Sequence, residues 1–208
     1  MRAAFGPQHW WPGETPFEVC VGAILTQNTA WSNVERAIAN LKGAGVLEPR
    51  RLHALPLTDL ARLLRPAGYF NVKAARLRAF LDVLVDEFGG ELERLFGGAT
   101  PVVRARLLAI KGIGPETADC MLLYAGGHAS FVVDAYTRRI FHRHGWCAEA
   151  EAYHDLQTLC AASLSHRPDA ATLDYWQDYH AQLVRVGKQF CRPRAPRCEA
   201  CPLQCLLP

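Results

Sequence analysis

The 208-residue chain has no apolar run approaching the roughly 18 residues that a membrane-spanning helix needs. Residues 1–16 include Gln8, His9 and Glu14 among several prolines and glycines, which is unlike an export signal. The net charge is only +3, from 23 basic and 20 acidic residues, and no repeat of about 20–50 residues recurs. These absences argue against a membrane protein and a solenoid, and they predict a cytoplasmic protein.

Alternating strand patterns are also scarce, since the one short candidate is the segment 131–133 (FVV). Half of the residues are apolar, 10% are aromatic and 21% are charged, which indicates a folded chain with a core rather than a disordered one. Helical spacing recurs along the chain, so we expect an all-α fold of about ten helices.

Helix signals come with their caps. Thr15 to Glu18 form a capping box with Pro16 at the first helical position, and Asn71, Thr100 and Asp134 are further candidate starts. The expected helices cover residues 16–27, 33–41, 71–88, 100–108, 115–123, 135–143, 153–165 and 171–186.

The eight cysteines fall into two groups, and an intracellular address predicts that both are reduced. Cys20, Cys120, Cys147 and Cys160 are scattered and are expected to be buried small hydrophobes. The others form the pattern Cys191-x6-Cys198-x2-Cys201-x3-Cys205, with no histidine among them. This spacing predicts a metal site rather than free thiols. Four thiolates suit tetrahedral zinc or a cubane iron–sulfur cluster, and spacing alone does not choose between them.

A tight turn is predicted at residues 111–115 (KGIGP), between two apolar helices. Glycines let a backbone approach another molecule closely, and the free N–H groups at the start of the second helix attract a phosphate. We therefore expect Lys111, Gly112 and Gly114 to contact DNA phosphate, with positive charge added by Arg104 and Arg106. The alternative is a plain helix–helix turn without a ligand.

Asp134 directly follows the apolar triplet 131–133, and taken alone it is typical of a helix cap. In combination, the segments 108–119 (LAIKGIGPETAD) and 132–139 (VVDAYTRR) resemble the helix–hairpin–helix DNA glycosylases of the endonuclease III superfamily. The resemblance extends over nearly the whole chain and includes the segment 22–29 (GAILTQNT) and the carboxy-terminal cysteines.

This resemblance implies two helical domains with a cleft between them. One is a six-helix barrel over residues 15–129 that contains the hairpin, and the other combines residues 1–14 and 130–208 with an iron–sulfur cluster loop. It implies a monomer, nucleoid-associated, whose partner is double-stranded DNA containing a damaged base. It also favours a [4Fe–4S] cluster over zinc, although the last cysteine interval has three residues where the family has five.

The resemblance assigns roles to individual residues as well. Asp134 would stabilise the positive charge that develops on the deoxyribose and help water to add. Gln27 would fill the space left when the target nucleotide leaves the duplex. Bifunctional members carry a lysine where this chain has Glu116, and a carboxylate cannot form a Schiff base. The sequence therefore predicts hydrolysis without strand cleavage, while the alternative for Glu116 is an acid that stabilises a helix start.

Trp10, Trp11 and Pro12, with the later Trp31, resemble the arrangement in endonuclease III-like 3-methyladenine DNA glycosylases, in which aromatic rings sandwich an alkylated purine. Such a base is cationic, so indole faces attract it by about 0.5–2 kcal/mol. Adjacent tryptophans can instead be hydrophobic anchors. The sequence predicts an alkylated, 3-methyladenine-like purine as the substrate.

Two other functions remain open at this point. The first is an endonuclease III-like glycosylase for oxidised pyrimidines or mispaired bases. The second is a catalytically silent DNA-binding iron–sulfur protein.

A basic group near the cysteines is expected to contact phosphate or to form a solvated face; it consists of Arg185, Lys188, Arg192, Arg194 and Arg197.

Overall fold

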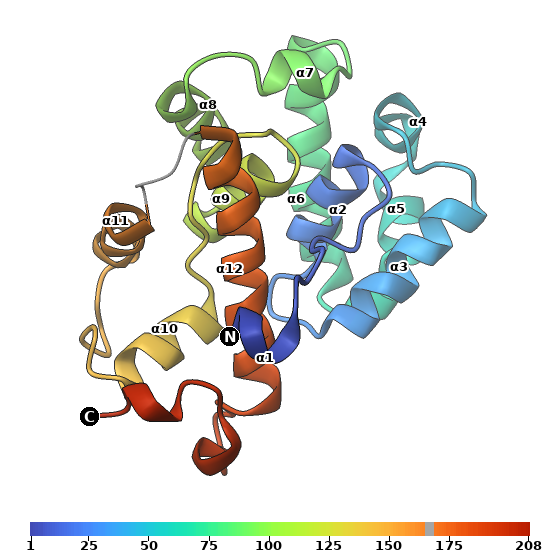
Figure 1. Ribbon diagram of the computed structural model, residues 1–208. Coiled ribbons are helices and arrows are strands. Elements are labelled where there is room, and N and C mark those ends of the chain that lie inside the picture. Colours follow the sequence, from blue (N-terminus) through green and yellow to red (C-terminus); the bar gives the residue numbers. More distant parts are fainter. Residues whose placement is uncertain (165–168) are drawn as a thin grey trace. The chain divides into compact units, whose positions relative to one another are not determined.

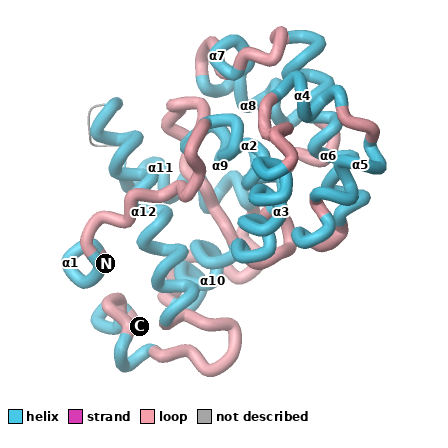
Figure 2. The backbone as a smooth tube through the Cα atoms, turned by 90° about the vertical axis from the view of Figure 1, so that its right-hand side faces the viewer, coloured by secondary structure: helices cyan, strands magenta, loops and turns pink. Residues whose placement is uncertain are grey.

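The computed structural model describes residues 1–164 and 169–208, and within these ranges it contains helices and no strand (Figure 2). The all-α prediction is confirmed. The chain divides into two compact units, Pro12–His128 and Met1–Trp11 with Ala129–Pro208, and each is described by itself. Among the described residues, no helix is both long and apolar enough to cross a bilayer.

The unit Pro12–His128 is built around one deeply buried helix. Its α-helices are α2 (Pro16–Leu25), α3 (Trp31–Gly43), α4 (Pro49–Ala54), α5 (Leu57–Leu63), α6 (Phe70–Asp82), α7 (Leu92–Leu95), α8 (Thr100–Leu108) and α9 (Pro115–Tyr124). A 3-10 turn (Arg65–Ala67) precedes α6, and a π-helix (Val83–Glu87) continues it (Figure 1). The Thr15 hydroxyl accepts a hydrogen bond from the Glu18 N–H at 3.1 Å, so the predicted cap is confirmed. Every residue from Phe17 to Leu25 is buried, which makes α2 the core helix of this unit.

The starts of α6 and α3 differ from the prediction, whereas α8 begins at Thr100 as predicted but without a side-chain cap. Helix α6 begins at Phe70 after Tyr69, whose φ is 45°, so Asn71 lies inside the helix and its assignment as a cap was wrong. Helix α8 begins at Thr100 after Ala99, and α3 begins at Trp31. None of these three helices has a side-chain cap, so local cap chemistry did not place their first residues. Packing of their apolar faces overrides such weak local preferences.

Helix α9 packs against α2 and α8, and its residues Thr117 to Leu123 are buried. An ion pair ties α8 to α9. The Nε and Nη2 atoms of Arg104 donate to the two carboxylate oxygens of Asp119 at 2.8 and 2.9 Å, and Asp119 is fully buried. The two helices that flank the predicted turn are therefore held together by a bidentate, charge-assisted pair.

The second unit contains α1 (Arg2–Phe5), α10 (Ala135–Arg143), α11 (Tyr153–Leu164) and α12 (Asp169–Gln189), with two 3-10 turns at Cys198–Ala200 and Gln204–Leu206. The predicted end of the helix 153–165, at Ser165, lies outside the described residues. Helices α10 and α12 pack closely (Figure 1). A Cβ on Gly187 of α12 would lie 2.3 Å from the Tyr136 ring of α10, so this approach requires glycine.

The strand candidate 131–133 is a buried segment without regular secondary structure that leads into α10, and it is not a strand. The Gln157 side chain donates to the Phe131 carbonyl at 2.8 Å, and the Val133 N–H donates to the Tyr153 hydroxyl at 3.3 Å. Side chains of α11 thus replace the partner strand that would otherwise satisfy this backbone. The segment is anchored immediately before Asp134.

Three of the scattered cysteines, Cys20, Cys120 and Cys160, are buried as predicted. Cys147 is only half-buried, so its prediction was wrong.

Candidate functional site

Asp134 is the N-cap of α10, as predicted. Its Oδ1 accepts a hydrogen bond from the Thr137 N–H at 2.7 Å. Its Oδ2 lies 3.5 Å from Nε2 of His180 on α12, and the Asp134 side chain is 12% exposed. The cap and the catalytic candidate are therefore the same carboxylate, nearly enclosed by its own unit.

The environment of Asp134 keeps this carboxyl ionised. Burial raises its pKa, but the His180 ring and the Thr137 N–H lower it by more, so the pKa lies below its ordinary value of 3.8. The start of α10 contributes partial positive charge in the same direction. A charged oxygen atom can thus persist in a site with little water around it.

The hairpin gives its two glycines different surroundings. Gly112 has a φ of 91°, and a Cβ there would meet the Arg76 side chain at 2.3 Å, so Arg76 lies directly over it. Gly114 is the N-cap of α9, and a Cβ there would meet nothing within 4 Å. Open space therefore lies at the start of α9, beside the N–H groups that were predicted to bind a phosphate.

Charged residues around the hairpin are divided. Lys111 and Glu116 are both exposed, with Glu116 in the first turn of α9. Arg104 does not join Lys111, because it is paired with Asp119, and Arg106 donates to the carbonyls of Leu95 and Gly97. The expectation that both arginines add to a phosphate site was therefore wrong.

Gln27, which follows the end of α2, is docked on the hairpin. Its Nε2 donates to the Gly112 carbonyl at 3.1 Å and to the Thr117 hydroxyl at 2.9 Å, and its Oε1 accepts from Arg76. The sequence pointed to Gln27 and to the turn separately, 85 residues apart, and the fold joins them. Arg76 and Thr117 had no sequence signal that marked them as partners of this glutamine.

Lys73 fixes the end of α2 from beneath. Its side chain is fully buried, and Nζ donates to the Leu25 carbonyl at 2.8 Å and to the Ala67 carbonyl at 2.7 Å. Burial, and then the charge of Arg76, lower the pKa of Lys73. A positive donor at the last carbonyls of a helix is stabilising, so Lys73 positions the segment that carries Gln27.

The structure places the tryptophans in different units. Trp10 and Trp11 are half-buried, with ring centroids 5.8 Å apart in an edge-to-face arrangement. Nζ of Lys188 lies 5.3 Å from the centre of the Trp10 ring. Pro12 is exposed, and Trp31 is the first residue of α3 in the other unit.

Three of the four clustered cysteines line one cavity. Cys191, Cys198 and Cys201 face it together with Phe190, Leu203 and His144, whereas Cys205 is exposed in the adjoining turn Gln204–Leu206 and does not line it. Burial raises the pKa of Cys201, as do the charges of Cys191 and Cys198. Mutually repelling thiolates in an apolar pocket suit a metal cation.

Two arginines of α10 support this loop. Nη1 of Arg143 lies 3.4 Å from Sγ of Cys191 and donates to the Arg192 carbonyl at 2.7 Å. Nε of Arg139 donates to the Cys191 carbonyl at 2.7 Å. The donor set therefore fits a thiolate-bound metal group, with N–H donors directed at the first cysteine.

The predicted basic group splits in two. Arg185 lies over the Phe5 ring at 4.5 Å, and Lys188 lies over Trp10, so both contact the amino-terminal segment. Arg192, Arg194 and Arg197 are exposed on the cysteine loop.

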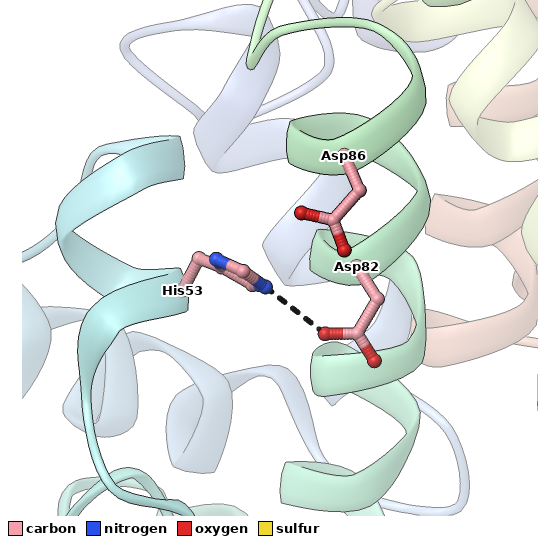
Figure 3. Close-up of side chains that lie close together, drawn as sticks. All are labelled: His53, Asp82 and Asp86. Carbon is pink, nitrogen blue, oxygen red and sulfur yellow. Dashed lines mark hydrogen bonds and ion pairs between the residues drawn. The ribbon is translucent and has the colours of Figure 1, made fainter.

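A further cluster of polar side chains, which no motif predicted, joins α4 to the end of α6 (Figure 3). Nε2 of His53 lies 3.1 Å from Oδ1 of Asp82, and the nearest polar atoms of His53, Asp82 and Asp86 all lie within 4.8 Å of one another. Arg78 donates to the carbonyls of His53 and Leu55. These contacts hold α4 against α6.

Known proteins are similar to this chain over most of its length. Residues 21–165 match the family model described as HhH-GPD superfamily base excision DNA repair protein. A Methanocaldococcus jannaschii protein, named as a candidate DNA repair glycosylase, is 44% identical over 201 residues, covering 96% of this chain and 89% of that protein.

Solved structures agree with this match. A 3-methyladenine DNA glycosylase of H. pylori bound to 1,N6-ethenoadenine is 31% identical, with a TM-score of 0.71 over 86% of this chain and 88% of that chain. An endonuclease III–DNA complex has a TM-score of 0.80 at 22% identity, over 99% of this chain and 89% of that chain, which shows a shared fold.

The chain therefore belongs to the HhH-GPD superfamily of base excision DNA repair proteins. Within it, the chain is a DNA repair glycosylase similar to endonuclease III and to the 3-methyladenine enzymes, as its motifs predicted.

Proposed function

We propose that this protein is a monofunctional DNA glycosylase that hydrolyses the N-glycosidic bond of alkylated, 3-methyladenine-like purines in double-stranded DNA. The observation that carries the proposal is Glu116 in the first turn of α9, immediately after the hairpin. The 31% identity to a 3-methyladenine DNA glycosylase over 86% of the chain supports the choice of substrate.

Asp134 supplies the charge that the reaction needs. Departure of the purine leaves a cation on the deoxyribose, and a fixed carboxylate stabilises that cation more strongly in a dry site than in water. The lowered pKa of Asp134 supports this role, because the carboxyl stays ionised at neutral pH. Water then adds to the sugar cation and loses a proton to solvent, and the role proposed for Asp134 in this step is to help the water add.

Glu116 determines what the reaction cannot do. An imine forms only with an amine, so a carboxylate after the hairpin leaves water as the attacking group. Lys111 precedes the turn, whereas the bifunctional relatives carry their nucleophile after it. The expected product is an intact abasic site.

The substrate preference rests on the tryptophans. The Lys188 ammonium already lies 5.3 Å from the centre of the Trp10 ring, so this indole attracts a cation in the free protein. A methylated purine carries the same charge on a flat ring, which adds stacking to the electrostatic attraction. Normal, neutral purines would gain less.

DNA contacts are expected at two places in the larger unit. The open start of α9 at Gly114 can take a phosphate, and Lys111 adds positive charge. Gln27 is docked on Gly112 and Thr117 in the free protein, so entering the vacated space in the duplex requires exchange of those hydrogen bonds. Base flipping costs on the order of a few kcal/mol, which such contacts offset.

A panel of duplexes, each carrying one lesion, tests the substrate. We expect release of 3-methyladenine and no release of thymine glycol or of mispaired thymine or adenine. Release of thymine glycol alone would replace this proposal with an oxidised-pyrimidine glycosylase. Salt-sensitive binding with no release from any duplex would indicate a silent DNA-binding protein.

Borohydride trapping tests the chemistry. With the unmodified protein, reduction during the reaction should leave no covalent protein–DNA complex, since no amine attacks the sugar. Glu116→Lys introduces an amine after the hairpin and is expected to give some trapped complex and some strand cleavage. A trapped complex with the parent protein contradicts the water route.

A [4Fe–4S] cluster is the metal group proposed for the cysteine cavity, where it would hold the loop in place. Cys191, Cys198 and Cys201 would bind it, with Cys205 as the fourth ligand. The purified protein should be brown with about four irons per chain, and Cys201→Ser should remove them. Cys147→Ser is the matched control, because Cys147 does not line the cavity, and it should keep the iron. A colourless protein with one zinc per chain would contradict the assignment.

A further inference from the structure

The two oxygens of Asp134 have different neighbours, and only one neighbour is part of the helix cap. Oδ1 accepts from the Thr137 N–H, which any N-cap carboxylate does. Oδ2 lies 3.5 Å from Nε2 of His180, at the long end of hydrogen-bonding distance, and no capping rule accounts for it. His180 lies 46 positions farther along the chain and its side chain is 5% exposed.

Contacts on α12 both before and after His180 hold this residue next to Asp134. Trp176, His180 and Gly187 are spaced by four and seven residues, so they share one face of the helix. The Phe131 ring, on the connector that leads to Asp134, contacts Trp176 edge-on at 5.8 Å. Gly187 lets the Tyr136 ring of α10 approach α12. The segments before and after Asp134 are thus both packed on the His180 face.

His180 is a buried polar residue, and buried polar side chains generally have a hydrogen-bond partner. Both residues are nearly enclosed, so the carboxylate has little water to solvate it and depends on the donors around it. Other polar groups near Asp134 come from α10: the Thr137 N–H, and the Tyr136 hydroxyl, whose neighbour Arg139 carries positive charge. Tyr136 is affected by Asp134, since burial and then the Asp134 charge raise the pKa of Tyr136.

We propose that His180 is a positioning residue for the glycosylase reaction: its Nε2–H donates to Oδ2 of Asp134, holds that carboxylate ionised and restricts its rotation. The catalytic meaning of this contact rests on the proposed function, but the contact itself does not. With Oδ1 held by Thr137 and Oδ2 by His180, the charge is fixed before the sugar cation forms. Charge fixed in advance needs no reorganisation during the reaction.

Two substitutions separate the donor from the ring. His180→Phe keeps a flat ring of similar size and removes the donor, with His180→Leu as the alternative if Phe does not fold. His180→Gln keeps an N–H donor and removes the imidazole ring. Ala181→Gly is the matched control, because it weakens α12 at a buried neighbouring position without removing a polar group.

The first measurement needs no activity. The carboxyl carbon of Asp134 is followed by 13C NMR against pH in the free protein, and its signal is identified by its absence in Asp134→Asn. We expect the Asp134 pKa to rise in His180→Phe and to stay near the parent value in His180→Gln and Ala181→Gly. An unchanged pKa in His180→Phe overturns the proposal.

The second measurement is the single-turnover rate of base release against pH. His180→Phe should reduce the rate by on the order of 10- to 100-fold and move its acid limb to higher pH, while His180→Gln restores most of the rate. A parent-like rate and pH profile in His180→Phe also overturns the proposal. If the parent protein releases no base from any lesion, the proposed function fails, and the NMR titration still decides the role of His180.

Discussion

Asp134→Asn is expected to reduce the single-turnover rate of base release by on the order of 10²- to 10³-fold while DNA binding survives. The substitution keeps the size and shape of the side chain, but it removes the negative charge and the second acceptor oxygen, which faces His180. An asparagine oxygen can still accept from the Thr137 N–H, which lies 2.7 Å from Oδ1, so α10 keeps its cap. The rate is measured with enzyme in excess over a lesion-containing duplex, and binding is measured by fluorescence anisotropy.

Asp134→Ala is the informative comparison, because it removes the cap as well as the charge. Its stability should fall by about 1 kcal/mol more than that of Asp134→Asn, with a similar rate defect. Equal rates for the parent protein and Asp134→Asn would remove this residue from the mechanism.

The same carboxylate makes the stability of the fold depend on pH. Its pKa in the folded protein lies below the ordinary value of 3.8, so its ionised form stabilises the fold at pH above 3.8. That contribution disappears as the pH falls through the lower, folded-state pKa. The difference in free energy of unfolding between the parent protein and Asp134→Asn, measured in urea, should therefore be largest near neutral pH and shrink in acid.

Arg104→Met is expected to lower the free energy of unfolding by about 3–5 kcal/mol, a large share of the roughly 5–15 kcal/mol typical of a domain. Asp119 is fully buried on α9, and both of its oxygens accept from Arg104. Without the guanidinium, a charged carboxylate remains in the core. Arg106→Met, the same change on the same helix, removes donors to the Leu95 and Gly97 carbonyls and a cation–π contact with Phe88, but it leaves no buried charge unpaired and should cost less.

The pair is also asymmetric. The Arg104 side chain is 25% exposed, so in Asp119→Leu the guanidinium can reach water, and the loss should be smaller than in Arg104→Met. The double variant Arg104→Met with Asp119→Leu should recover much of the stability, because no buried charge is left. The free energy of unfolding of the parent protein and of these four variants is measured by denaturant titration. A loss below about 1 kcal/mol in Arg104→Met would contradict this account.

Residues that act on their immediate neighbours were predictable. Thr15 capping α2 and Asp134 capping α10 follow from side chains that reach N–H groups three residues away. Asn71 has the same chemistry but lies inside α6, which begins at Phe70 after Tyr69, a residue in the left-handed conformation. Local chemistry decides a helix start only when packing does not oppose it.

The contacts that build the site could not be predicted from local sequence patterns. Gln27 with Thr117, and His180 with Asp134, join residues 90 and 46 positions apart, and no spacing rule links them. Arg104 was expected to add positive charge near the turn, yet its guanidinium is paired with the buried carboxylate of Asp119. The sequence gives the sign of the charge on a side chain, but it does not show which way that side chain points.

The amino-acid sequence by itself determined the helical class, the hairpin, the cysteine loop and membership of the superfamily, because these depend on short-range patterns of polarity, glycine and spacing. Only the tertiary structure decided which polar groups meet: Gln27 on the hairpin, Arg104 with Asp119, and His180 beside Asp134. The physical reason is burial. An enclosed charge must find a partner wherever the packing of helices brings one, however distant it is along the chain.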